Sequence, residues 1–105
     1  MADKVVEAGA ITTPDAARRV GERVRVAGMR QTWRRSGTAR GDYVYFMTMD
    51  DPEGTMNVFI SAEVYNRNSK IFSNDVPFLV EGIVEVSQSG EEPTLRAEKV
   101  WRLIN

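Results

Sequence analysis

The sequence contains no cysteine and no histidine among its 105 residues. Without these side chains the chain cannot build a zinc finger, a thiolate nucleophile, a Ser-His-Asp triad or an imidazole acid–base pair. A bound metal would need a site made entirely of oxygen ligands, and no glycine-rich helix start that could cradle a phosphate is present. We therefore expect no cofactor and no metal site, and we predict that the chain is not an enzyme.

Long apolar runs are also missing. Charge interrupts the first residues, MADKVVE, and no stretch approaches the ~18 apolar residues that a membrane-spanning helix requires. The lack of disulfides suits the cytosol, so we expect a cytoplasmic protein with no membrane partner. The length leaves room for one domain, and we predict a flexible lead-in at residues 1–12 followed by a single domain at residues 13–105.

Acidic residues are missing from one segment of the chain. The formal net charge is -1, from 14 Lys and Arg against 15 Asp and Glu, which would normally disfavour a polyanionic partner. Residues 23–41, however, carry six arginines and no acid, which leaves -7 for the remainder. This uneven distribution of charge would direct a polyanion to one part of the surface.

The hydropathy pattern predicts the order of the elements. Thr13 as N-cap, Pro14 at the first helical position and Gly21 beyond the end indicate a short N-terminal helix. Alternation of period two predicts strands elsewhere, and the first of them contains Gly28, as expected for a bend. The predicted strands are 23–33, 43–49, 55–60, 76–86 and 95–103, with a polar loop at 34–41, an acidic turn at 50–54 and a helix that begins after Ser61.

Five strands with one helix between the third and the fourth fit a small closed barrel better than an open sheet, because closure removes the sheet edges. We predict an all-β fold, namely a five-stranded barrel of the oligonucleotide/oligosaccharide-binding (OB) type with an additional short N-terminal helix.

Five short motifs carry a resemblance to a known family. They are VRVAG at 24–28, GTARG at 37–41, FMTMDDPEG at 46–54, EVY at 63–65 and LVEGIV at 79–84. In this order the motifs resemble the anticodon-binding type of OB domain. The chain is most similar to the OB domain near the C-terminus of bacterial DNA polymerase III alpha subunits, particularly the error-prone branch, and more distantly to the N-terminal domain of class II aminoacyl-tRNA synthetases. The match covers residues 21–103.

Two positions depart from the polymerase-type pattern. Ser36 stands where the family favours a proline, and Ile60 with Ser61 stands where it favours Phe-Pro. The polymerase domain itself is absent from the sequence. The resemblance implies binding to single-stranded nucleic acid.

Strand alternation predicts which side chains reach the surface. In 43–49 the odd-numbered positions hold Tyr, Tyr, Met and Met, and in 55–60 the even-numbered positions hold Met, Val and Ile. We assign these sets to the barrel interior. The outward side chains are then Val44, Phe46, Thr48, Thr55, Asn57 and Phe59.

The outward phenylalanines are candidates for stacking on bases. The resemblance implies that Phe46 stacks on a base and that Asn57 reads a base edge, as the matching residues do in the synthetase domains. Alternatively, an N-terminal segment or a partner covers Phe46 and Phe59, or the two strand faces are reversed.

The predicted 34–41 loop would supply cations for phosphates. Arg34, Arg35 and Arg40 lie on this loop, with Arg30 and Trp33 at its approach; a solvated charged loop is the alternative. The Trp33 indole either stacks on a base or anchors the loop.

The sequence therefore predicts a stand-alone OB-fold protein that binds single-stranded nucleic acid, with single-stranded DNA favoured over RNA. Bases would stack on aromatic residues of the second and third strands, while arginines of the loop contact phosphates. The alternative function is a protein–protein interaction module whose partner is a polymerase or a repair protein.

Overall fold

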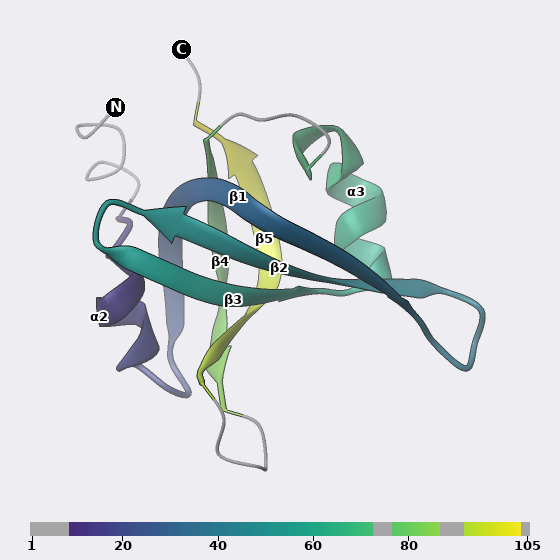
Figure 1. Ribbon diagram of the computed structural model, residues 1–105, viewed down its shortest axis with the longest axis horizontal. Coiled ribbons are helices and arrows are strands. Elements are labelled where there is room, and N and C mark those ends of the chain that lie inside the picture. The colour runs from purple at the N-terminus through teal and green to yellow at the C-terminus, as the bar shows by residue number, and fades with distance from the viewer. Residues whose placement is uncertain (1–8, 73–76, 87–91, 104–105) are drawn as a thin grey trace.

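The computed structural model describes residues 9–72, 77–86 and 92–103, and it contains the predicted barrel. Five strands close in the order β1-β2-β3-β5-β4 (Figure 1). Along the chain, helix α3 follows β3 and precedes β4, and the short α2 precedes β1. The elements are α2 (Thr13–Ala17), β1 (Arg23–Gly37), β2 (Tyr43–Asp51), β3 (Gly54–Ile60), α3 (Ala62–Phe72), β4 (Phe78–Glu85) and β5 (Thr94–Arg102). The OB fold and its two helices are confirmed.

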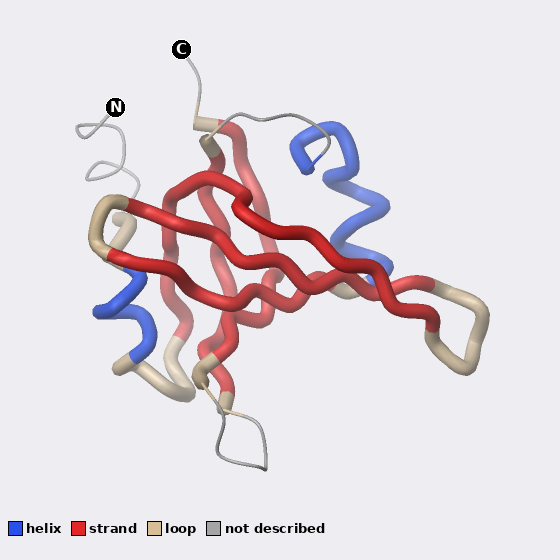
Figure 2. Tube along the Cα trace, in the orientation of Figure 1, coloured by secondary structure: helices blue, strands red, loops and turns tan. Residues whose placement is uncertain are grey.

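Strand β1 bends at Gly28, and it therefore pairs with β4 before the bend and with β2 after it. Residues 23–28 pair with β4, whereas the pairing with β2 begins at Met29. Figure 2 shows the bend as an arch in the tube. A Cβ atom on Gly28 would lie 2.1 Å from the carbonyl oxygen of Asp50, so the close approach of the two strands requires glycine at this position.

The core consists of the inward side chains of the strands together with one side of each helix. Alternation predicted the inward set correctly for β2 and β3, since Met47, Met49, Val58 and Ile60 are buried. Tyr43 is the exception and is 45% exposed. Val64 and Phe72 of α3 are buried in the same core, as is Ala16 of α2. Figure 1 shows the two helices on opposite sides of the barrel.

The N-terminal helix begins one residue earlier than predicted. Thr12 is the N-cap, and its hydroxyl accepts a hydrogen bond from the Asp15 N–H. Thr13 was the wrong choice because its hydroxyl and N–H are used in a tertiary contact with Asp51. Residues 1–8 of the predicted lead-in lie outside the described residues, but Ile11 pairs with Val26 of β1 and packs against the core.

The prediction that Arg34 and Arg35 lie on a loop was wrong. Strand β1 continues to Gly37, and its residues 32–37 pair with β2 residues 43–48. The polar sequence remains extended because backbone hydrogen bonding to β2 and ring contacts across the ribbon stabilise it. The connecting loop is therefore residues 38–42.

Candidate functional site

One row of outward side chains crosses four strands of the barrel. The strand registers place Arg34 of β1 opposite Phe46 of β2, Phe46 opposite Phe59 of β3, and Phe59 opposite Arg96 of β5. The Arg34 guanidinium carbon lies 5.2 Å from the Phe46 ring centroid. The Phe46 and Phe59 centroids are 5.5 Å apart, with a 59° angle between the rings. Two aromatic rings thus stand side by side with a cation at each end of the row, and we call these four residues the ring row.

The ring row faces solvent, as predicted from alternation. Phe46 is 36% exposed and Phe59 is partly exposed, while their neighbours Tyr45 and Met47 are buried. The two strand faces are therefore not reversed. An exposed pair of phenylalanines offers flat apolar surface to a planar ligand.

A second row of polar side chains runs beside the ring row. The registers align Thr32, Thr48, Asn57 and Thr94 across the same four strands. The Thr48 N–H donates a hydrogen bond to the Thr32 hydroxyl at 3.2 Å. The side chain of Asn57 is exposed, so hydrogen-bond donors and acceptors lie on the same face as the rings, two residues along each strand.

The predicted arginines do not form a single patch. Arg34 and Arg35 are consecutive residues of a strand, and their side chains point to opposite faces. Arg34 belongs to the ring row, whereas the Arg35 guanidinium carbon lies 4.2 Å from the Tyr43 ring centroid on the other face.

Trp33 and Arg30 contact α3 rather than the outer face. The Trp33 ring lies 5.1 Å from Tyr45, 5.8 Å from Tyr65 and 5.5 Å from Phe72, measured between centroids. Arg30 donates a hydrogen bond to the backbone carbonyl of Phe72. The structure thus shows Trp33 in an anchoring position, and a base-stacking role for it stays a prediction.

Tyr45 and Tyr65 form the centre of this aromatic cluster. Their rings stack at a centroid distance of 3.9 Å with a 20° angle between planes. Burial of the Tyr45 phenol raises its pKa above the ordinary value, and the neighbouring Tyr65 contributes to the shift.

Arg40 lies on the exposed tip of the β1–β2 hairpin. The Thr38 N–H donates to the Asp42 carbonyl at 2.8 Å, and the Gly41 N–H donates to the Thr38 carbonyl at 3.1 Å. Gly41 has a φ of +90°, a value that favours glycine. The tip therefore has a defined turn that presents Arg40 to solvent.

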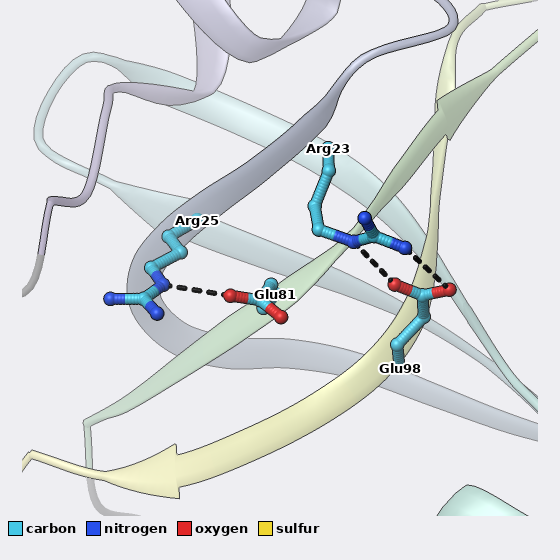
Figure 3. Close-up of polar contacts among 4 residues, drawn as sticks. All are labelled: Arg23, Arg25, Glu81 and Glu98. Atoms are coloured by element: carbon cyan, nitrogen blue, oxygen red, sulfur yellow. Dashed lines mark hydrogen bonds and ion pairs between the residues drawn. The ribbon is translucent and has the colours of Figure 1, made fainter.

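Two further arginines of the basic segment are neutralised on another side of the barrel. Arg23 Nε lies 2.9 Å from Glu98 Oε1, and Arg25 Nε lies 2.9 Å from Glu81 Oε1. Figure 3 shows these arginines reaching from β1 towards β4 and β5. The hydrogen bond from Arg23 lowers the pKa of the Glu98 carboxyl, and the same bond raises the pKa of Arg23. The charge of residues 23–41 is thus divided among several surfaces.

A surface cavity of about 380 Å³ lies beside these ion pairs and includes Arg23, Arg25 and Glu81 in its wall. Among the described residues, no group of three or more acidic side chains is arranged to hold a metal ion. In the same part of the chain, no helix is both long enough and apolar enough to cross a membrane.

The sequence did not identify Arg96 and Thr94 as candidates. The alternation of Arg96 with buried Leu95 and Ala97 marks it as an outward residue. Its place beside Phe59 depends on the parallel pairing of β3 with β5, which joins residues far apart in the chain. Local patterns carry no information on that pairing.

No protein-family model matches the chain. Over 67 residues, 64% of this chain, the sequence is 40% identical to an error-prone DNA polymerase from Rhodopirellula baltica. The chain spans 6% of the length of that polymerase.

Solved structures share the architecture. Asparaginyl-tRNA synthetase from Pyrococcus horikoshii matches with a TM-score of 0.71 and 20% identity over 90% of this chain and 22% of its own. An OBody bound to hen egg-white lysozyme gives a TM-score of 0.62 with 20% identity, over 89% of this chain and 91% of that one. A lipoprotein from Klebsiella pneumoniae that is described as nucleic acid-binding gives a TM-score of 0.61 with 20% identity, over 88% of this chain and 78% of that one. The predicted resemblance to polymerase and synthetase OB domains is confirmed.

Proposed function

We propose that the outer face of β1, β2, β3 and β5 binds single-stranded nucleic acid without catalysing a reaction. The ring row carries this proposal, because it combines the two devices that hold single strands on one surface. Aromatic rings stack on bases, and cations contact the phosphates. Phe46 and Phe59 provide the rings, and Arg34 and Arg96 flank them in register.

The remaining residues of this face have complementary roles. Asn57 and Thr48 lie beside the rings and donate or accept hydrogen bonds at base edges or sugars. Arg40, at the tip of the hairpin, contacts phosphate. The similarity to a DNA polymerase and to a tRNA synthetase supports nucleic acid as the class of ligand.

Single-stranded DNA is the favoured ligand over RNA, since the relative with 40% identity is a DNA polymerase. The second candidate function is binding of a protein, such as a polymerase or a repair protein, on the same face. The OBody supports this alternative because it is an OB-like structure bound to a protein, lysozyme.

The test is fluorescence anisotropy with labelled oligo-dT, oligo-dA, oligo-rU and duplex DNA at two salt concentrations. We expect a preference for single strands, tighter binding of DNA than of RNA, and an affinity that falls with salt. Phe46→Ala should weaken binding with little change in the salt slope, and Arg34→Ala should reduce the slope by about one.

Matched variants separate these effects from general damage. Phe46→Tyr keeps a ring, whereas Phe46→Leu keeps only apolar surface, so only the latter should lose affinity. Arg67→Ala removes an exposed arginine on α3, away from the ring row, and should leave binding unchanged. Absence of single-strand binding at low salt by the folded wild type would overturn the proposal, and a copurified protein that Phe46→Leu releases would favour the alternative.

A further inference from the structure

The β1–β2 hairpin has a second exposed face that the proposed function does not use. Strand pairing continues to Gly37 and Tyr43, and Figure 1 shows the hairpin projecting beyond the barrel. A two-stranded ribbon presents alternate side chains on opposite faces. Here one face carries Arg34 with Phe46, and the reverse face carries Arg35 with Tyr43.

The reverse face repeats the chemistry of the ring row. The Arg35 guanidinium carbon lies 4.2 Å from the Tyr43 centroid, and Tyr43 is 45% exposed. Gly37 is the residue opposite Tyr43 in β1 and has no side chain to cover the ring. The Arg35 guanidinium thus lies over the Tyr43 ring, and a base can stack on the exposed part of the ring or on the guanidinium plane.

Neighbouring rings hold this face in position. Tyr45 lies two residues along β2 from Tyr43, on the same face, and stacks on Tyr65 of α3. Trp33, two residues before Arg35 in β1, contacts both Tyr45 and Tyr65. Because these rings pack against α3, the base of the hairpin is fixed and Tyr43 needs little ordering when a ligand binds.

We infer that Tyr43 and Arg35 form a second stacking site, which takes a nucleotide of the same single strand after it passes the edge or tip of the hairpin. This inference rests on the proposed function of the ring row. Tyr43 and Phe46 are three residues apart in β2, roughly 10 Å along the strand, so a few further nucleotides can connect the two faces. Arg40 at the tip lies where the connecting phosphates pass.

The test is a length series of oligo-dT, measured with the wild type, Tyr43→Ala, Tyr43→Phe and Phe46→Ala. The shortest oligonucleotides that bind should occupy only the ring row, and their affinity should be unaffected by Tyr43→Ala. The longer ones should lose roughly 5- to 150-fold in affinity with Tyr43→Ala, the range expected for one stacked base. Tyr43→Phe should retain wild-type affinity, and Phe46→Ala should weaken binding at every length.

An optical signal locates the ligand independently. The chain has two tryptophans, so Trp101→Phe leaves Trp33 as the only one, on the reverse face of the hairpin. Long oligonucleotides should change Trp33 fluorescence, and short ones should not. Tyr43→Leu keeps apolar bulk without a ring and replaces Tyr43→Ala if circular dichroism shows that the alanine variant is unfolded.

The outcomes separate this inference from the proposed function. If Tyr43→Ala and Tyr43→Leu bind all lengths like the wild type while Phe46→Ala is weakened, the second site is overturned and the proposed function stands. Equal loss at every length with the Tyr43 variants also overturns it, because Tyr43 would then belong to the first site. A wild type that binds no single strand of any length overturns both.

Discussion

Thr13 donates two hydrogen bonds to the carboxylate of Asp51, one from its N–H to Oδ2 at 2.7 Å and one from its hydroxyl to Oδ1 at 3.1 Å. The same Oδ1 accepts hydrogen bonds from the N–H groups of Glu53 and Gly54 at 2.8 and 2.9 Å. This carboxylate therefore closes the β2–β3 turn and attaches α2 to it.

We predict that Asp51→Asn lowers the free energy of unfolding by about 1–3 kcal/mol, because an amide NH₂ must then face a backbone donor and the charge is lost. Urea denaturation measures the change. Asp50→Asn changes the preceding residue in the same way and should cost less than about 0.5 kcal/mol. Equal effects of the two substitutions would contradict the role of Asp51.

Gly28→Ala should destabilise the barrel by more than about 3 kcal/mol, since its Cβ would lie 2.1 Å from a carbonyl oxygen of the adjacent strand. Gly37→Ala is the matched control in the same strand. Its Cβ would meet only the Tyr43 ring, at 3.8 Å, so thermal unfolding of this variant should resemble that of the wild type.

The ion pair of Arg23 with Glu98 predicts how stability depends on acid. The native pKa of Glu98 is lower than its ordinary value of 4.5, so the unfolded chain binds a proton first as the pH falls. The stabilisation is present above pH 4.5 and is lost as the pH falls through the lower native pKa. Glu98→Gln should reduce the loss of melting temperature between neutral and acidic pH, and an unchanged loss would contradict the role of this ion pair.

The raised pKa of Tyr45 predicts that the protein loses stability at alkaline pH. The native pKa of Tyr45 is raised above 10.0, so folding favours the neutral phenol, and stability falls as the pH rises above 10.0 towards the native pKa. Ultraviolet titration of the phenols should contain a step above pH 10.0 that Tyr45→Phe removes. If the step that Tyr45→Phe removes lies at or below pH 10.0, the burial of this phenol is contradicted.

Removing the negative charge of Glu85 should strengthen the binding of single-stranded DNA. Glu85 Oε1 lies 3.2 Å from Arg96 Nε, where it offsets a cation of the ring row. Glu85→Gln should tighten oligo-dT binding by about 2- to 5-fold, the equivalent of an exposed ion pair. Anisotropy titration at low salt measures the change, with Glu63→Gln as the control for loss of an acid elsewhere. Weaker binding by Glu85→Gln would argue against phosphate contact at Arg96.

The sequence by itself determined the barrel and the orientation of its central side chains. The period-two pattern of β2 and β3 placed Met47 and Val58 inside and Phe46 and Phe59 outside, because successive side chains of a strand point to opposite faces. The helix between β3 and β4 followed from an equally local pattern.

Only the tertiary structure decided which residues meet. Arg96 lies beside Phe59 because β3 and β5 pair in parallel on closure of the barrel. Pairing with β2 keeps β1 extended to Gly37, which puts Arg34 and Arg35 on opposite faces, and contact with α3 gives Trp33 its anchoring position. Side-chain periodicity is a property of each strand alone, whereas register and ion pairs depend on contacts between distant segments, which no local pattern encodes.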